Sequence, residues 1–239
     1  TLITSVKKRL LSQRPIGCLL SGGLDSSLIA SILSKEMKKS DMKLKTFSIG
    51  FSPNATDLIA ARKVAGFLGT DHQEIVVSPQ EAFESINKVI KELGSYDITT
   101  VRASVGMYLI CQWISKNTDI KVLFSGEGAD ELFCGYLYFH HAPSPEAIEK
   151  ESIRLVNELQ FFDVLRSDRT VSCHGLELRV PFLDKKVIEL ALQIPGEDRH
   201  PKNTMEKFLL RSAFDDGTYI PSEILWRRKE GFSDGVGSK

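Results

Sequence analysis

The sequence predicts an α/β fold with a doubly wound parallel sheet, followed by a mostly helical C-terminal part. Over the first 142 residues, short apolar runs alternate with amphipathic segments of helical length. After about residue 142 the strand pattern fades and helical periodicity dominates. Strands that alternate with helices are typical of parallel β-α units, because a parallel neighbour requires a crossover connection. The alternation therefore favours an open sheet with helices on both faces.

Each expected element has its own signal in the sequence. The strands are expected in four apolar or alternating runs, at residues 16–20, 44–51, 72–77 and 121–125. Helices are expected between and after them, at residues 26–39, 57–69, 78–94 and 103–117. Asp57 and Gly69 bound the second helix, and Ser78 before a proline starts the third. Beyond residue 142, "SPEAIEKESIRLVNELQFFDVLRSDRTV" and "DKKVIELALQI" predict further helices.

Composition excludes several classes of protein. Of the 239 residues, 31 are Lys or Arg and 31 are Asp or Glu, so the net charge is zero. This balance argues against a nucleic-acid partner or a polybasic membrane surface, and no apolar run approaches the length of a transmembrane helix. The four cysteines contain no Cys-x-x-Cys pair, which favours free thiols in a reducing, cytoplasmic compartment. Without an initial Met, the chain is expected to be a piece of a longer polypeptide.

The stretch "GCLLSGGLDSSLIAS" at residues 17–31 marks a candidate ligand site. A Ser-Gly-Gly turn follows a predicted buried strand, where ligands bind in such sheets, beside a helix N-terminus. Its amides can form an anion-binding nest, and Ser21, Ser26 and Ser27 add hydroxyl donors. A carboxylate at Asp25 suits Mg²⁺ held beside bound phosphates. The alternative is a plain strand-to-helix turn in which Asp25 or Ser26 caps the helix.

Sequence motifs indicate which kind of phosphate site this is. The pattern G-x-x-x-x-G-K-[ST] is absent, and "GEGADE" at 126–131 is a poor match to G-x-G-x-x-G. "SGGLDSS" resembles the pyrophosphate loop of the N-type ATP pyrophosphatases, which include GMP, NAD and argininosuccinate synthetases. Four further stretches resemble the synthetase domain of the glutamine-hydrolysing asparagine synthetase family. They are "YDITTVRAS" (96–104), "LFSGEGADELFCGYLYFHHAPSP" (123–145), "HGLELRVPFLDKK" (174–186) and "WRRKEGFSDGVG" (226–237).

The resemblance covers essentially the whole chain and implies its organisation and reaction. It implies an adenine nucleotide α-hydrolase-like fold, with one synthetase domain over residues 1–239. Residues 1–142 would be the nucleotide-binding core and 143–239 the mostly helical part. The implied reaction uses ATP and Mg²⁺ to convert aspartate to β-aspartyl-AMP, which ammonia attacks to give asparagine, AMP and pyrophosphate. A glutaminase domain, absent from this chain, would precede it and supply ammonia, and a homodimer is left open.

The resemblance also implies roles for individual residues. Asp25 and Asp130 match the Mg²⁺-associated carboxylates, Glu127 matches an acid needed to form and consume the adenylate, and Lys229 matches a lysine on the reacting phosphate. Aspartate is expected to meet Thr99, Val101 and Arg102 in the "TTVRA" loop. The remaining expected contacts are to the nucleotide, from Leu19, Ser21, Gly22, Gly23, Asp25, Ser26, Ser27, Ile49, Ser125 and Gly126.

Structural alternatives remain open for several of these residues. Glu127, Asp130 and Glu131 fit ordinary first-turn acids favoured by a helix dipole. The run of Arg227, Arg228 and Lys229 fits a solvated basic surface. The pair "HH" at 140–141 is expected to be a surface pair, because adjacent side chains point apart. Gly231 and Ala129 depart from the usual pattern of the family, but neither replaces a charged catalytic group.

Two other functions also account for parts of the sequence. A related adenylating enzyme, such as a β-lactam synthetase, shares the loop and the G-x-G-A-D-E type of strand end, but "YDITTVRAS" favours aspartate over a larger substrate. A non-catalytic nucleotide-binding module would be expected to lack Asp25, Glu127 or Lys229, and the sequence has all three. Fold alone does not decide between these functions.

Overall fold

The computed structural model describes residues 1–201 and 205–228. These residues form a five-stranded sheet in which every neighbouring pair is parallel, in the order β3-β2-β1-β4-β5. The strands are β1 (Ile16–Leu19), β2 (Lys45–Gly50), β3 (Asp71–Val76), β4 (Val122–Phe124) and β5 (Glu177–Arg179). The chain enters the sheet at the central strand β1, extends to one edge through β2 and β3, and then continues on the other side of β1 with β4. The direction of winding reverses between β1 and β4, where α/β sheets form a ligand crevice.

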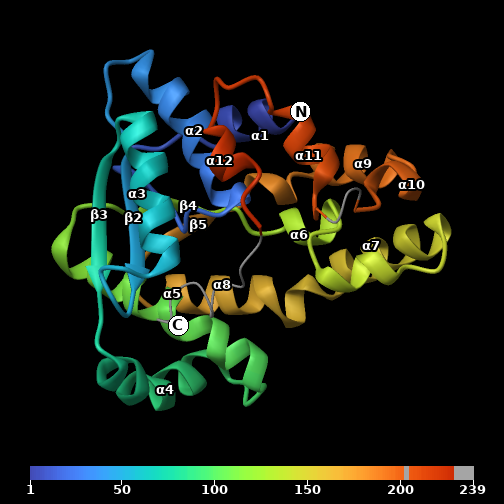
Figure 1. The fold of residues 1–239 in the computed structure, drawn as a ribbon. Coiled ribbons are helices and arrows are strands. Elements are labelled where there is room, and N and C mark those ends of the chain that lie inside the picture. The colour runs from blue at the N-terminus through green and yellow to red at the C-terminus, as the bar shows by residue number, and fades with distance from the viewer. Residues whose placement is uncertain (202–204, 229–239) are drawn as a thin grey trace.

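Helices cover both faces of the sheet, which confirms the predicted fold class (Figure 1). One face is covered by α1 (Leu2–Lys8), α2 (Leu24–Lys38) and α3 (Thr56–Leu68), and the other by α5 (Ile98–Asn117) and α8 (Asp163–Ser172). The alternation of side chains along β4 separates two cores. Val122 and Phe124 join the cluster of α2 and α3, whereas Leu123 joins the cluster of α5 and α8. An outer helix, α4 (Pro79–Leu93), packs against α5.

Local sequence explains where several helices begin and end. Ser78 accepts a hydrogen bond from the Glu81 amide while the Glu81 side chain accepts one from the Ser78 amide, so α4 starts with a capping box. Both α3 and α4 end at a glycine in the left-handed region, with φ of 67° at Gly69 and 64° at Gly94. The stop at Gly69 and the start at Ser78 confirm the prediction. The predicted start of α3 at Asp57 is wrong, because Ala55 is the N-cap and Asp57 lies inside the first turn.

The helix α5 begins five residues earlier than expected. Asp97 is its N-cap and accepts a hydrogen bond from the Thr100 amide at 2.7 Å. The sequence predicts a loop at "TTVRA", but this stretch forms the first turns of a helix. β-branched residues are poor helix formers, so their pattern hid this start. The cap at Asp97 and the burial of Thr100 override that weak propensity.

The part of the chain after residue 125 is mostly helical but contributes one strand. It contains α6 (Ala129–Leu132), η1 (Leu137–His141), α7 (Pro145–Glu158), η2 (Leu159–Phe161), η3 (Pro181–Leu183), α9 (Lys185–Gln193), α10 (Gly196–Arg199), α11 (Phe208–Ala213) and α12 (Ser222–Leu225). The strand β5 was not predicted, because none of its three residues is fully buried and they form no apolar run. Its pairing with β4 means that the sheet includes residues beyond 142. Within the described residues, none of the helices combines the length and apolar character needed to cross a bilayer.

Candidate active site

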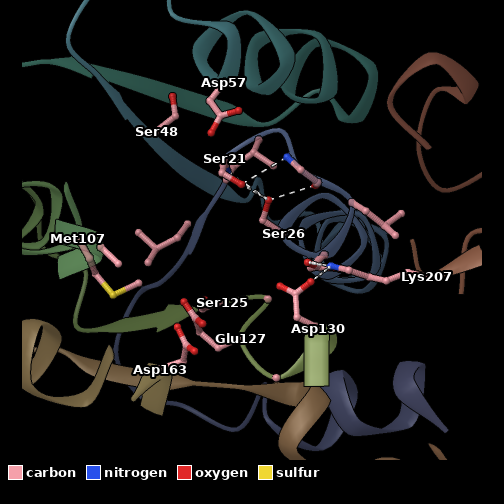
Figure 2. A pocket seen from close by; sticks show the side chains of 18 of the residues that line it. Ser21, Ser26, Ser48, Asp57, Met107, Ser125, Glu127, Asp130, Asp163 and Lys207 are labelled. Carbon is pink, nitrogen blue, oxygen red and sulfur yellow. Dashed lines mark hydrogen bonds and ion pairs between the residues drawn. The ribbon is translucent and has the colours of Figure 1, made fainter. Parts of the chain in front are cut away.

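A cavity of about 400 Å³ opens where the carboxyl ends of β1, β2 and β4 meet the N-terminus of α2. It lies at the reversal of strand order, where the topology favours a ligand site. Figure 2 shows carboxylates, hydroxyls and an ammonium from separate elements pointing into this space. The residues predicted from the sequence that line it are Leu19, Ser21, Gly23, Asp25, Ser26, Ile49, Thr99, Ser125, Gly126, Glu127 and Asp130.

Four other predicted residues do not line the cavity. Gly22 has φ of 77°, and a Cβ there would lie 2.5 Å from the backbone nitrogen of Ala61, so this glycine lets the loop pack against α3. Ser27 is fully buried, and its Oγ has no hydrogen-bond partner within the described part of the chain. Val101 packs on the core between α4 and α5, and Arg102 is exposed. Lys229 lies outside the described residues.

The loop after β1 is held by hydrogen bonds between its own serines. Ser26 Oγ accepts from the Ser21 amide at 3.2 Å and lies 3.0 Å from Ser21 Oγ, which in turn accepts from the Gly23 amide at 3.3 Å. The N-cap of α2 is Gly23, and within the described residues no side chain caps this helix. The alternative in which Asp25 or Ser26 is only a cap is therefore wrong. The N-terminus of this 15-residue helix faces the cavity, where its dipole favours an anion.

A lysine not expected from the sequence joins the two predicted metal carboxylates. Lys207 Nζ lies 2.5 Å from Asp25 Oδ2 and 2.8 Å from Asp130 Oδ1, and its side chain is 2% exposed (Figure 2). Burial alone would lower the pKa of Lys207, but the two carboxylates outweigh it and raise the pKa above its usual value. Lys207 therefore stays charged inside the cavity.

Close packing around Lys207 depends on a glycine. A Cβ at Gly135 would lie 1.8 Å from Asp130 Oδ1 and 2.4 Å from Lys207 Cε, so a larger residue would displace both. The sequence "MEKFLLR" reads as an ordinary amphipathic helix start, which gives no local sign that its lysine reaches a loop 182 residues earlier. The resemblance implied a lysine at the reacting phosphate but assigned that role to Lys229.

Glu127 is fixed by an arginine that the sequence analysis did not single out. Arg166 Nη2 lies 3.0 Å from Glu127 Oε2 and 2.8 Å from Asp163 Oδ1, with 9% of the arginine side chain exposed. Burial raises the pKa of Glu127 above its usual value, and Arg166 offsets only part of this effect. Glu127 precedes Gly128, the N-cap of α6, so it is not a first-turn acid of that helix.

A second carboxyl in the cavity also has a raised pKa. Burial and the neighbouring Asp130 raise the pKa of Glu131 to about 7, although a hydrogen bond from Tyr136 opposes this shift. The Tyr136 hydroxyl donates to Glu131 Oε1 at 2.6 Å. Glu131 is 3% exposed and lies in the first turn of α6, where the helix dipole favours an acid. Its raised pKa also suits a group that exchanges a proton near neutral pH.

The C-terminal segment reaches the loop through Arg227. Its Nη2 lies 2.9 Å from Asp57 Oδ1 and its Nη1 donates to the Gly22 carbonyl at 3.3 Å. Asp57, at the start of α3, also lines the cavity and lies beside Ser21 and Ser48 in Figure 2. The expectation of a fully solvated basic run is wrong at this position, because Arg227 is half-buried and ion-paired.

Asp25 and Asp130 are arranged so that they can share one cation. Both carboxylates lie within 2.8 Å of the same nitrogen, so they are the candidate ligands for a divalent cation at this point of the cavity. No cluster of three or more His, Cys, Asp or Glu suited to a metal occurs among the described residues. Two carboxylates suit Mg²⁺, which usually takes only one or two from the protein and its other ligands from water and phosphate.

Known proteins match nearly the whole chain. The sequence model of the asparagine synthase family matches residues 1–159 and 142–239. Proteins named asparagine synthetase [glutamine-hydrolyzing] are similar over 98% of the chain. The human protein is 58% identical over 236 residues, the chicken (Gallus gallus) protein 56% over 236, and that of Cricetulus griseus 56% over 237.

The chain spans 42% of the length of these relatives. One solved structure, an NAD+ synthetase from Burkholderia pseudomallei, is 13% identical with a TM-score of 0.37, over 80% of this chain and 84% of the other. The site geometry, the family match and the relatives lead to one conclusion, that this chain belongs to the asparagine synthase family.

Proposed function

We propose that this chain synthesises asparagine by activating the β-carboxylate of aspartate with ATP and transferring the β-aspartyl group to ammonia. The observation that carries this proposal is the meeting of Lys207, Asp25 and Asp130 at the N-terminus of α2. It combines donors for a pyrophosphate with a buried cation, which are the groups that an attack at the α-phosphorus needs. The names of the relatives support asparagine as the product. The resemblance of "YDITTVRAS" to the family supports aspartate as the substrate.

The nucleotide would lie across the strand ends. In this proposal the adenosine packs at Leu19, Ile49, Ser125 and Gly126, and the pyrophosphate meets the Ser21–Ser27 loop. An aspartate oxygen attacks the α-phosphorus, the bond to the β-phosphate oxygen breaks, and pyrophosphate leaves from the loop. Lys207 would stabilise the negative charge that develops on the phosphate oxygens, and Lys229 is a second candidate for this role. Mg²⁺ held by Asp25 and Asp130 would supply further charge neutralisation when bound.

Ammonia would then attack the activated carbonyl on the side of Glu127. The C–N bond forms, the bond to the AMP oxygen breaks, and the attacking nitrogen loses one proton to a base. Glu127 is the proposed base, because its raised pKa makes it a better proton acceptor than an ordinary surface carboxylate, and Arg166 fixes its direction. Thr99, Val101 and Arg102 are proposed to meet aspartate, and of these Thr99 lines the cavity.

The ammonia is proposed to come from a glutaminase domain of the full-length polypeptide. The relatives extend well beyond this chain, and their names include glutamine hydrolysis. The isolated chain would therefore use ammonium but not glutamine. Asparagine formed from glutamine by the isolated chain would contradict this division of labour.

The direct test is incubation with ATP, Mg²⁺, aspartate and ammonium, followed by identification of every product. The expected products are asparagine, AMP and pyrophosphate in equal amounts, and the control without aspartate should release no pyrophosphate. ADP with inorganic phosphate would overturn the proposal. A parallel assay with amino acids larger than aspartate tests the β-lactam synthetase alternative. That alternative predicts that a larger substrate is consumed without ammonium.

A further inference from the structure

His140 is not the surface histidine that its doublet with His141 predicts. Its Nε2 lies 2.7 Å from Glu206 Oε1, and the two side chains are 22% and 6% exposed. A carboxylate only accepts hydrogen bonds, so Nε2 carries the proton of this contact. Burial would raise the pKa of Glu206, but the hydrogen bond from His140 outweighs it and holds the pKa below its usual value. The neighbouring His141 is exposed.

Glu206 precedes Lys207, whose backbone is in an unfavourable conformation. Lys207 has φ of 55° and ψ of 33°, in the left-handed region, where a residue with a Cβ is strained. Such a conformation persists only when its surroundings hold it. Two contacts of the backbone do so, because the Glu206 carbonyl accepts from Arg211 Nε at 2.8 Å and the Lys207 carbonyl accepts from the Arg211 amide at 3.0 Å.

The His140 contact joins the two segments that supply the charged groups of the site. His140 belongs to η1, which follows α6 and its Asp130 within ten residues. The same two segments meet a second time where Asp130 binds Lys207. Two attachment points fix both the position and the orientation of one segment on the other, whereas the Asp130–Lys207 pair alone would join them at a single point.

We propose that His140 is a positioning residue, which acts through Glu206 to hold Lys207 in the left-handed conformation that directs Nζ between Asp25 and Asp130. His140 itself does not line the cavity. Its effect on catalysis rests on the function proposed above, but its effect on Lys207 does not, so the two can fail separately.

The sharpest test compares two variants that differ only in reach. In His140→Gln an amide N–H can occupy the place of Nε2 and donate to Glu206, whereas in His140→Asn the amide is one carbon too short. His141→Asn is the matched control at an exposed neighbour. The accessibility of Lys207 is measured by brief acetylation with acetic anhydride and mass spectrometry, relative to Lys63, which is half exposed and serves as the internal reference.

Acetylation of Lys207 relative to Lys63 is expected to rise about tenfold in His140→Asn, as follows from losing one hydrogen bond to a charged group. His140→Gln and His141→Asn should match the unmodified chain. Circular dichroism establishes that each variant is folded. A folded His140→Asn with unchanged acetylation of Lys207, or equal acetylation in the Asn and Gln variants, would overturn the proposal.

The kinetic readout separates positioning from simple loss of structure. In His140→Asn, kcat for asparagine formation should fall by up to about 10²-fold, since a displacement near 1 Å has effects of that size, while KM for ATP changes little. His140→Gln should recover most of kcat. If the unmodified chain makes no asparagine, the proposed function fails, while the acetylation result still decides the role of His140.

Discussion

The ammonium of Lys207 lies 2.5 Å from the carboxylate of Asp25, although the two residues are 182 positions apart in the chain. This contact brings the C-terminal part of the chain to the loop after β1, where a bound pyrophosphate would lie. Asp130 joins the same ammonium from a third segment at 2.8 Å. A site assembled in this way supplies positive charge beside a helix N-terminus without using the lysine of a P-loop.

Replacing Lys207 by Met tests whether this residue or Lys229 carries the charge on the reacting phosphate. Lys207→Met should lower kcat for asparagine formation about 10²- to 10³-fold, as does the loss of one preorganised transition-state contact. Lys63→Met is the control, because Lys63 is exposed and, within residues 1–201 and 205–228, its one ion pair is to the exposed Glu223. If Lys229→Met alone had the large effect and Lys207→Met were near normal, the ion pairs of Lys207 would be structural.

The role of Asp25 can be separated from helix capping by Asp25→Asn. The substitution keeps shape and removes charge, so it should abolish most cation binding while the protein still folds, because α2 has no side-chain cap at Asp25 to lose. Aspartate-dependent ATP–pyrophosphate exchange should fall about 10²- to 10³-fold. The free energy of unfolding should fall by about 2 kcal/mol, since Lys207 keeps only one of its two carboxylate partners.

The control for Asp25→Asn is Asp119→Asn, at an exposed aspartate whose only described ion pair is to Lys45, 3.5 Å away. Both measurements should be unchanged in the control. Mn²⁺ binding, followed by electron paramagnetic resonance with a non-hydrolysable ATP analogue, provides a second readout. Near-normal Mn²⁺ binding and exchange in a folded Asp25→Asn variant would remove the metal role from this loop.

The loop after β1 was predictable because its information is local. A buried strand, two glycines, three hydroxyls and a carboxylate follow one another within the twelve residues 16–27, and the structure places this segment beside the cavity. Lys207 and Arg166 could not be found in this way. Each lies in an ordinary helical pattern, and its partner is set by packing between segments 39 to 182 residues apart.

The lack of local information also explains where the predicted fold differs from the structure. The central strands can be recognised in the sequence by their apolar runs, because both of their faces are buried. The edge strand β5 has one exposed and two partly buried residues, and it is defined by its pairing with β4, which no local pattern predicts. The early start of α5 depends on one cap at Asp97 and on the burial of Thr100, which outweigh a run of β-branched residues.

Glu127→Gln separates the two half-reactions. If Glu127 acts only as the base for ammonia, ATP–pyrophosphate exchange with aspartate survives and asparagine formation is lost. If it also helps to form the adenylate, both are lost, and we expect this second result because Glu127 follows the strand end that faces the cavity. Glu223→Gln, at an exposed glutamate, is the control. Full asparagine synthesis by Glu127→Gln would exclude it from the chemistry.

Asp184 connects the first helix to the C-terminal part of the chain and should make stability depend on pH. Its Oδ2 lies 2.7 Å from Arg9 Nη1 and also binds Lys8, while its Oδ1 accepts from the Lys186 amide at the start of α9. Burial would raise the pKa of Asp184, but Lys8 and Arg9 outweigh it and lower the pKa to about 2. Because the pKa is lower in the folded state, this stabilisation is complete above the unfolded pKa near 4 and is lost as the pH falls from about 4 to about 2.

Asp184→Asn should therefore destabilise the chain in a pH-dependent way. Asparagine still caps α9, so the loss of about 2 kcal/mol expected at pH 7 reports the ion pairs. Urea unfolding of both proteins at pH 7, 5, 4 and 3 should give a constant difference down to about pH 5 and a shrinking one below. Asp216→Asn, at an exposed aspartate that also accepts from a backbone amide, should change little at any pH. A difference between Asp184→Asn and the unmodified chain that stays constant to pH 3 would mean that the ion pairs do not stabilise the junction of α1 and α9.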